Sequence, residues 1–253
     1  MITQYILTIS DGSGRPRPSF WAYRLYAWLL SQIDGDYAEL IHRSGENPLS
    51  QYLYRDPALG RDLWVVNILN DTVTSHFDPV LQTVQEILLH TGTLHTTLEA
   101  VRTCTLTQLT NAAQGRARSR RSALRFVTAT AFKSGGRYAI FPQKRWLLQS
   151  LISRWQIAFP EMPLDDPDAF LLLEDGLHIT DYTLHTTRYP LKAVKIPGFL
   201  GTITVDSRLA APMEEVWQLL LSFAPYSGVG IKTTLGMGAL QTEPLRLSSF
   251  DEK

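Results

Sequence analysis

Hydrophobic and polar positions in the first hundred residues alternate with two periods, which predict strands and helices in turn. Residues 5–9 alternate and end at a Gly-rich turn at 11–14, which predicts a first strand. Helical spacing from residue 19 to a stop signal at Gly35 predicts a helix, carried by Trp21, Leu25, Trp28, Leu29 and Ile33. Further strands are predicted at 38–41, 49–54, 63–69 and 96–102, and a helix at 79–90. This is the element order of a split β-α-β, or ferredoxin-like, unit.

The second half of the chain has a similar order of elements. Strands are predicted at 123–132, 177–189 and 198–205, and helices at 144–157 and 212–223. An acidic, proline-rich loop is expected at 161–168. We therefore expect an α+β protein of two tandem ferredoxin-like (RRM-like) β-α-β-β-α-β units, 1–112 and 113–253, with a C-terminal glycine-rich loop.

The distribution of charge changes what the net charge implies. The 253 residues carry 24 Lys and Arg against 24 Asp and Glu, and a formal net charge of zero argues against binding nucleic acid through net charge alone. Residues 100–160, however, hold eleven basic side chains and no acidic one. Five arginines fall within 116–125, which is typical either of a solvated surface loop or of a mobile loop that orders on a polyanion. The acid-free stretch favours the polyanion.

Cysteine and histidine usage excludes several other classes. The single Cys104 forms no internal disulfide, and no apolar run reaches the length of a membrane span, so we expect a soluble, cytoplasmic protein with no membrane partner. None of the six histidines pairs with a carboxylate at metal-ligand spacing. A metal-dependent nuclease is therefore disfavoured, and no metal or cofactor is expected.

A glycine-rich segment lies near the C-terminus at residues 228–238. It is not a phosphate-binding P-loop, because Ile231 separates Gly230 from Lys232, and it lacks the glycine that a dinucleotide fingerprint needs at Thr233. A hairpin without a ligand remains open, as does a flexible loop whose exposed backbone N–H groups approach a phosphate or a base.

Four parts of the chain resemble a known family. The glycine-rich segment is similar to that of the repeat-associated mysterious protein (RAMP) superfamily, and within it the chain resembles the CRISPR-associated repeat-processing endoribonucleases. Residues 127–155 resemble the start of that family's second half, and 198–203 the strand before its last helix. Residues 41–49 resemble the loop that holds its catalytic histidine. Together these segments cover most of the chain in the expected order.

The resemblance implies a catalytic role for His42, on a turn between two short strands, assisted by Tyr26 or Tyr23. RNA can be cleaved without a metal by its own 2′-OH, which needs a base, an acid and a cation for the developing charge. A histidine with a pKa of about 6.5 can transfer either proton. The alternatives are that His42 is a surface histidine without a role and that Tyr26 and Tyr23 pack in the core. Family members often carry a lysine where this chain has Asn47, and Arg43, Lys232 or an arginine of 116–125 could replace that cation.

Basic side chains and the glycine-rich segment are the candidates for RNA contact. They are Arg43, Arg116, Arg118, Arg120, Arg121, Arg125, Lys133, Lys144, Arg145, Gly228, Gly230, Lys232 and Thr233. The resemblance implies an endoribonuclease that binds CRISPR repeat RNA and cleaves precursor CRISPR RNA, leaving 2′,3′-cyclic phosphate and 5′-OH ends. A non-catalytic RNA-binding subunit of an interference complex is the alternative, and a protein that binds a small anion is a third. Interference-complex proteins and a second copy, forming a homodimer, are further candidate partners.

Overall fold

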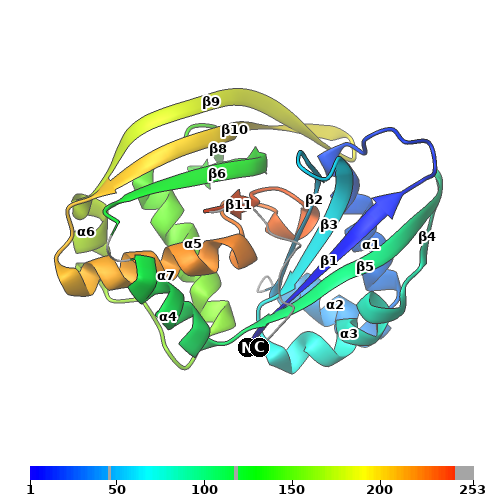
Figure 1. Ribbon diagram of the computed structural model, residues 1–253, viewed down its shortest axis with the longest axis horizontal. Helices are drawn as coiled ribbons and strands as arrows, with labels where there is room; N and C mark the ends of the chain where they lie inside the picture. Colours follow the sequence, from blue (N-terminus) through cyan, green and yellow to red (C-terminus); the bar gives the residue numbers. More distant parts are fainter. Residues whose placement is uncertain (45–46, 117–118, 243–253) are drawn as a thin grey trace.

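The computed structural model describes residues 1–44, 47–116 and 119–242 as two neighbouring β-sheets with helices packed against them (Figure 1). The first sheet is antiparallel in the order β2-β3-β1-β5-β4. Its strands are β1 (Ile2–Ser10), β2 (Leu49–Asp56), β3 (Arg61–Ile68), β4 (Glu86–Leu89) and β5 (Gly92–Cys104). The helical elements of this half are η1 (Ser19–Trp21), α1 (Ala22–Ser31), α2 (Gly35–Ser44), η2 (Asp71–Val73) and α3 (Thr74–Thr83).

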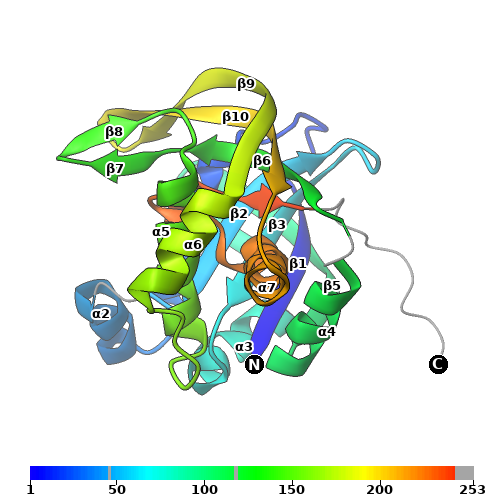
Figure 2. The same ribbon diagram turned by 90° about the vertical axis from the view of Figure 1, so that its left-hand side faces the viewer.

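The second sheet is antiparallel in the order β11-β6-β10-β9 and arches over two helices, α5 and α7 (Figure 1). Its strands are β6 (Arg121–Thr130), β9 (Leu177–Leu191), β10 (Val194–Ser207) and β11 (Leu240–Gln241). The helical elements of this half are α4 (Leu106–Arg116), α5 (Lys144–Ala158), α6 (Pro167–Gly176), α7 (Ala211–Ser227) and η3 (Thr233–Leu235). A small hairpin of β7 (Phe132–Ser134) and β8 (Arg137–Ala139) projects from this sheet (Figure 2).

Both sheets have the strand order of a ferredoxin-like unit. In the first sheet the central strands β1 and β3 are flanked by β2 and β5, and β4 adds an edge strand. In the second sheet the central strands β6 and β10 are flanked by β11 and β9. The expected α+β fold of two tandem ferredoxin-like units is therefore confirmed. Helix α4 spans residue 112 and packs through Leu109 and Ala113 in the core of the second half; the division into units 1–112 and 113–253 stays a prediction.

The first sheet is buried on both faces over β1, β2 and β3. One face packs against its own helices, with Tyr5 and Leu7 in the same cluster as Leu25, Leu29 and Phe77. The opposite face carries side chains that pack against Ala239 and Val127 of the second half; they are Ile6, Tyr52, Tyr54, Leu63 and Val65. A strand covered on both faces needs a continuous apolar run, which explains residues 63–69. The two halves therefore share a buried interface.

The predicted strand at 38–41 is wrong, because these residues belong to helix α2. The side chain of Asp34 accepts a hydrogen bond from the backbone N–H of Tyr37 (3.0 Å), and its carbonyl accepts from Ala38 (2.9 Å), which starts the helix. Tyr37 stacks on His76 of α3 with ring centroids 3.6 Å apart, and Ile41, one turn later, is buried. Gly35 therefore begins a helix of its own, four residues after α1 ends.

The predicted helix at 79–90 is wrong in its second part. Helix α3 begins earlier, at Thr74, and ends at Thr83, and β4 follows. Strand pairing with β5 takes over at this point, since the backbone N–H of Thr96 donates to Gln85 O (2.8 Å) and its hydroxyl to Val84 O (2.8 Å). Tertiary pairing thus overrides a local helical pattern.

Two helices that were not predicted, α4 and α6, have clear start signals. At α4, Thr105 and Gln108 form a capping box, each side chain bonding the other's backbone N–H at 3.2 and 2.8 Å. At α6, Asp166 caps the N–H groups of Asp168 (2.8 Å) and Ala169 (3.0 Å), with Pro167 in the first turn. The acidic loop at 161–168 is therefore shorter than expected and leads into a helix.

The arginine-rich stretch is not one mobile loop. Arg116 is the last residue of α4, whereas Arg121 and Arg125 lie within strand β6. Arg118 lies outside the described residues, as does the side chain of Arg116. Most of the segment therefore belongs to α4 or to β6. Ser119 and Arg120 are the described residues that lie between this helix and this strand.

Candidate functional site

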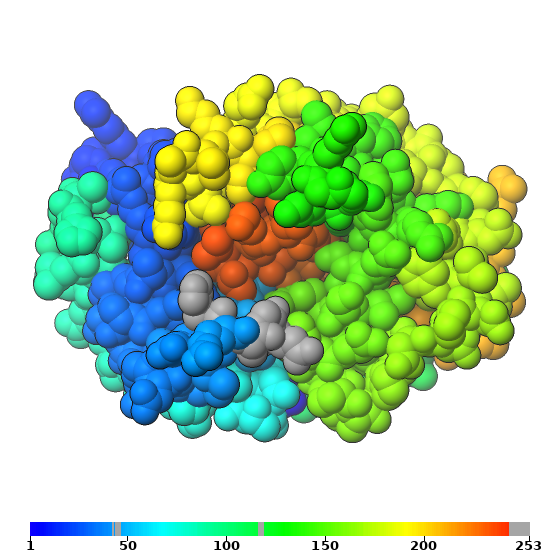
Figure 3. Space-filling view, turned by 180° about the vertical axis from the view of Figure 1, so that it is seen from behind, coloured from blue at the N-terminus to red at the C-terminus, as the bar shows by residue number. Residues whose placement is uncertain are grey.

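The Gly-rich segment, residues 228–238, lies where the two halves meet. Figure 3 shows it in orange-red at the centre of one face, between the blue N-terminal half and the green part of the second half. It follows α7, includes η3 and leads into β11. The blue helices of the N-terminal half reach the same face, which puts this face at the junction.

Backbone donors of the Gly-rich segment are used inside the protein. The N–H groups of Val229, Ile231 and Gly238 donate to Gly238 O (2.8 Å), Ala131 O (3.0 Å) and Ala129 O (3.0 Å), respectively. The N–H of Gly230 donates to the Ser150 hydroxyl (2.7 Å). The expectation of an open loop of exposed N–H groups is therefore corrected, because these donors join the segment to β6, to the β6–β7 bend and to α5.

Glycine is required in this segment for close approach of the backbone. A Cβ on Gly230 would collide with Ala131 O, and one on Gly238 with Val229 O; both glycines have positive φ, 79° and 74°. Gly228 is buried, and so is Thr233 at 6% exposure. Lys232, by contrast, is exposed and holds a left-handed backbone conformation at the start of η3 (φ 58°). Of the predicted contacts in this segment, Lys232 has its side chain in solvent.

Side chains from both halves of the chain donate hydrogen bonds to carbonyls of η3 in the Gly-rich segment. Gln51 of β2 donates from Nε2 to Thr234 O and to Ala22 O, both at 2.9 Å. The hydroxyl of Tyr189 in β9 donates to Leu235 O (2.6 Å). The Gly-rich segment is thus bonded to strands of both sheets, and it fixes their relative position.

His42 lies in the last turn of α2, and not on a turn between two strands as predicted. Its side chain lies outside the described part of the structure, as do residues 45 and 46. Description resumes at Asn47, which begins the short stretch 47–49 leading into β2, named here the Asn47 loop. The contacts of this loop are therefore the described geometry nearest to His42 in sequence.

Asn47 connects the loop to α1. Its Nδ2 donates to the hydroxyl of Tyr26 (2.7 Å), and its Oδ1 accepts from the backbone N–H of Leu49 (3.0 Å). Burial raises the pKa of Tyr26, whereas this hydrogen bond opposes the rise. The hydroxyl of Tyr26 is therefore protonated near neutral pH and, as it accepts from Asn47, retains its own proton to donate.

Arg154 of α5 holds the same loop from the other half of the chain. Its Nη1 donates to Asn47 O (2.6 Å) and its Nη2 to Leu49 O (3.0 Å). Burial lowers the pKa of this guanidinium to about 10, which leaves it protonated at neutral pH. A half-buried cation thus lies against the position where the related family often has a lysine.

Arg154 is a functional candidate that the sequence reasoning missed. It lies on the same helical face as Leu147 and Leu151, both of which are buried. A single arginine in the apolar stripe of a helix is the signal that could have identified it, because a buried charge needs specific partners. Its partners are backbone carbonyls more than a hundred residues away in sequence.

Tyr23, the other predicted assisting tyrosine, lies apart from the Asn47 loop contacts. It packs against a cluster that contains Met237 and Leu235 of the Gly-rich segment, and the ammonium of Lys192 lies 5.9 Å from its ring. The structure therefore links Tyr26 to the Asn47 loop and Tyr23 to the Gly-rich segment, two contacts of one helix.

Several of the predicted RNA-binding side chains have partners within the protein. The guanidinium of Arg120 donates to Leu209 O (2.8 Å), and the ammonium of Lys144 to Leu177 O (3.1 Å). Ion pairs join Arg43 to Glu39 (3.4 Å), Arg121 to Asp206 (3.7 Å) and Arg145 to Glu174 (2.7 Å). The side chains of Arg125 and Lys133 are exposed.

The predicted basic residues do not form one cluster. Arg121 lies at the start of β6, whereas Ala129, near the end of this strand, and Ala131, just after it, bond the Gly-rich segment. At the rise of an extended strand, the two ends of β6 are about 30 Å apart. Lys133, on the hairpin directly after this contact, and Lys232 both belong to the junction. The basic stretch thus divides into a junction group and a distant group.

Within the described residues, no three or more His, Cys, Asp or Glu side chains gather in a metal-ligating group. Among the helices that the structure describes, none combines the length and the apolar character needed to span a membrane.

Solved structures and a family model show what this fold is similar to. A RAMP protein described as binding different RNA substrates shares the fold, with a TM-score of 0.56 and 13% sequence identity over 95% of this chain and 98% of that one. The profile described as "CRISPR-associated endoribonuclease Cas6" matches residues 124–240.

Individual Cas6 proteins match nearly the whole chain. A Cas6 endoribonuclease of Streptococcus thermophilus is 29% identical over 229 residues, 88% of this chain and 91% of that protein. A Cas6 structure described as a product complex superposes with a TM-score of 0.77 and 25% identity, covering 96% of this chain and all of that one. The chain is therefore similar to Cas6 endoribonucleases over most of its length.

Proposed function

We propose that this protein binds CRISPR repeat RNA and cleaves precursor CRISPR RNA without a metal, by attack of the 2′-OH on the adjacent phosphate. This reaction forms a new bond from the 2′-oxygen to phosphorus and breaks the bond from phosphorus to the 5′-oxygen. The products carry a 2′,3′-cyclic phosphate and a 5′-OH. Similarity to Cas6 endoribonucleases and the contacts of the Asn47 loop support the proposal.

The observation that carries the proposal is the convergence of both halves on the Asn47 loop. Tyr26 and Arg154 fix Asn47 from α1 and α5, three residues after the end of the helix that bears His42. A rigid support of this kind holds a reacting group in productive geometry.

The proposed roles follow from the chemistry of each side chain. His42 transfers a proton, either as the base for the 2′-OH or as the acid for the leaving 5′-oxygen. Tyr26 donates a hydrogen bond, because burial keeps its hydroxyl protonated. Arg154 positions the loop and contributes positive charge at the site of the absent lysine. Tyr23 stays a candidate for assistance from the neighbouring turn of α1.

The proposed RNA path crosses the face shown in Figure 3. Lys232 and Lys133 belong to the junction and carry exposed side chains, and they would contact phosphates near the site of cleavage. Gly228, Gly230 and Thr233 would act by shaping this surface, and the remaining predicted basic residues would contact phosphates further along the RNA. Interference-complex proteins, a homodimer and a cytoplasmic location stay predictions.

The test incubates the purified protein with repeat RNA in EDTA and compares it with His42→Ala. We expect the wild-type protein to cut once, and the variant to bind with a similar Kd while cleavage falls by at least about 100-fold. Binding without cleavage by the wild-type protein would instead support the non-catalytic RNA-binding subunit. Cleavage by the variant at the wild-type rate would remove His42 from the mechanism.

A further inference from the structure

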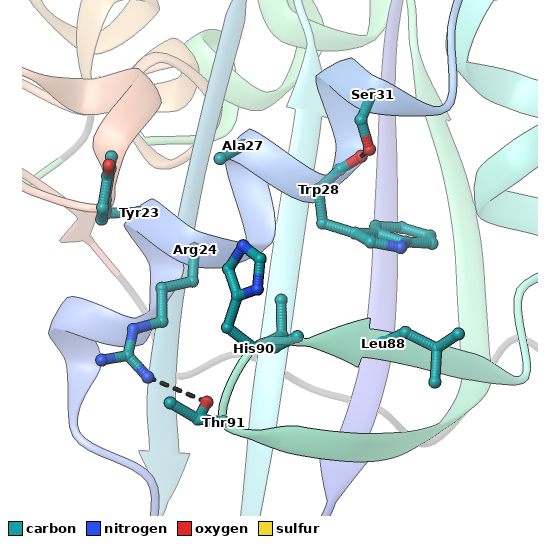
Figure 4. A pocket seen from close by; sticks show the side chains of 9 residues that line it. Tyr23, Arg24, Ala27, Trp28, Ser31, Leu88, His90 and Thr91 are labelled. Carbon is teal, nitrogen blue, oxygen red and sulfur yellow. Dashed lines mark hydrogen bonds between the residues drawn. The ribbon is translucent and has the colours of Figure 1, made fainter.

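A groove of about 730 Å³ opens between α1 and the turn that joins β4 to β5 (Figure 4). Tyr23, Arg24 and Trp28 line it from α1, and Leu88 and His90 from the strand and turn opposite. The groove lies on the side of α1 away from the contact between Tyr26 and Asn47, and of the residues that line it the proposed mechanism names Tyr23 alone.

Three flat rings line the groove, those of Tyr23, Trp28 and His90. Trp28 is held from behind by an edge contact with Trp64, whose ring centroid is 6.3 Å away at an interplanar angle of 71°. Figure 4 shows the imidazole of His90 between Arg24 and Trp28. Rings fixed in this way can stack on unpaired bases, whose faces are free.

The charge of the groove favours an anion. Its lining contains Arg24 and His90 and, among the described residues, no acidic side chain. Arg24 is held in place by a hydrogen bond from Nη1 to the Thr91 hydroxyl (3.0 Å; Figure 4). The Trp21 ring lies 4.8 Å from its guanidinium. A guanidinium has five N–H donors, so Arg24 keeps donors for a phosphate.

The groove is continuous with the junction face. Tyr23 lines the groove and also packs against the cluster that contains Met237 and Leu235, while Lys192 lies 5.9 Å from its ring. An RNA strand that crosses the Gly-rich segment can therefore pass from Lys192 over Tyr23 to Arg24 without leaving a basic surface.

We propose that this groove binds unpaired nucleotides of the RNA substrate, with bases stacked on Tyr23, Trp28 and His90 and a phosphate on Arg24. The inference rests on the proposed function in that the ligand is the same RNA. It adds a second point of contact, on the first half of the chain, that selects for single-stranded sequence. Duplex RNA would not use the groove, because its base faces are covered by stacking.

The first experiment uses a fluorescent octauridylate with one 4-thiouridine. After irradiation, we expect peptides that contain residues 22–31 and 88–91 to carry the cross-linked nucleotide. Binding is then measured by anisotropy for the wild-type protein, Arg24→Gln and His90→Ala at several salt concentrations. The matched control is Arg208→Ala, an exposed arginine between β10 and α7, at the end of the molecule away from α1 (Figure 1).

We expect Arg24→Gln and His90→Ala each to weaken octauridylate binding about tenfold, with the control unchanged. Loss of one phosphate contact should also reduce the slope of log affinity against log salt by about 0.7 for Arg24→Gln and not for His90→Ala. Melting temperatures of all variants confirm that they are folded.

The same proteins are assayed for cleavage of repeat RNA, which separates the two proposals. If the wild-type protein cleaves, while Arg24→Gln and His90→Ala bind octauridylate like the control, the groove proposal is overturned and the proposed function stands. If the two variants weaken octauridylate binding but the wild-type protein leaves repeat RNA intact, the groove is supported and the cleavage reaction is refuted.

Discussion

Two segments at the junction between the halves are held in opposite ways. The Asn47 loop is fixed by side chains, those of Tyr26, Asn47 and Arg154. The Gly-rich segment is fixed mainly by its own main chain, which bonds Ala129 and Ala131 of the second half at distances that exclude a Cβ. One segment depends on three particular functional groups, and the other on the absence of side chains.

Because of this difference, we expect the Gly-rich segment to contribute mainly to the stability of the fold and the Asn47 loop mainly to positioning for cleavage. Main-chain bonds join the Gly-rich segment to β6 and the β6–β7 bend, and its Thr234 carbonyl accepts from Gln51 of the first sheet, so loss of this arrangement should be felt by the whole fold. The side-chain bonds of the Asn47 loop hold a short connection next to the helix with His42, so their loss should affect cleavage more than unfolding. Substitutions in the two segments can test this contrast.

The largest effect on stability is expected for Gly238→Ala. The new Cβ would collide with Val229 O, and alanine is strained at a φ of 74°, so the free energy of unfolding should fall by about 3–5 kcal/mol. Urea denaturation measures this loss. The control is Gly12→Ala, whose φ of 79° is similar but whose Cβ would meet nothing within 4 Å; it should cost about 1–2 kcal/mol. Equal losses at the two positions would contradict the close-approach argument.

A smaller loss of stability, with a large loss of activity, is expected for Arg154→Ala. Two loop carbonyls lose their donors, which should cost about 2 kcal/mol in urea denaturation, while relief from burying a charge limits the loss. Because the loop can then move, kcat for repeat-RNA cleavage should fall about 100-fold with little change in KM.

Two further variants sharpen the Arg154 result. Arg154→Lys retains the charge and one donor direction, so it should recover part of kcat. Arg145→Ala, on the same helix, removes an ion pair with Glu174 and should cost less than about 1 kcal/mol of unfolding free energy. An Arg154→Ala variant that unfolds more easily but cleaves at the wild-type rate would make Arg154 structural only.

The smallest effect is expected for the contact between Tyr26 and Asn47. Tyr26→Phe and Asn47→Ala should each cost about 1 kcal/mol, and a double-mutant cycle should give a coupling energy of about 0.5–1.5 kcal/mol. Denaturation of the four proteins measures this energy. A coupling energy near zero would show that the hydrogen bond does not hold the loop, and a kcat for Tyr26→Phe equal to wild type would remove the hydroxyl from the mechanism.

Much of the fold was predictable because hydrophobic periodicity acts locally. The strands at 49–54, 63–69 and 177–189 and the helices at 144–157 and 212–223 were expected and observed with small changes of boundary. Helices α4 and α6 were also predictable in principle, since Thr105 with Gln108 and Asp166 with Pro167 are start signals written in neighbouring residues. The wrong strand at 38–41 arose because four residues are too few to distinguish the two periods.

The candidate site was predictable only in part. The resemblance of 41–49 to a known loop made His42 a candidate, which stays a prediction, and Asn47 was interpreted as the loss of a cation. The structure brings a different cation, Arg154, to that loop from helix α5. The Gly-rich segment was expected to expose its N–H groups, and they are instead bonded to Ala129, Ala131 and other internal acceptors.

The amino-acid sequence by itself determined most of the strands and helices, the pair of ferredoxin-like units and the resemblance to the Cas6 family, because each depends on patterns within a few turns or strands. Only the tertiary structure decided which donors of the Gly-rich segment are used internally, which basic side chains share the junction, and which cation reaches the Asn47 loop. Those outcomes depend on contacts such as that of Arg154 with Asn47, whose residues are 107 positions apart and meet only when the two halves pack.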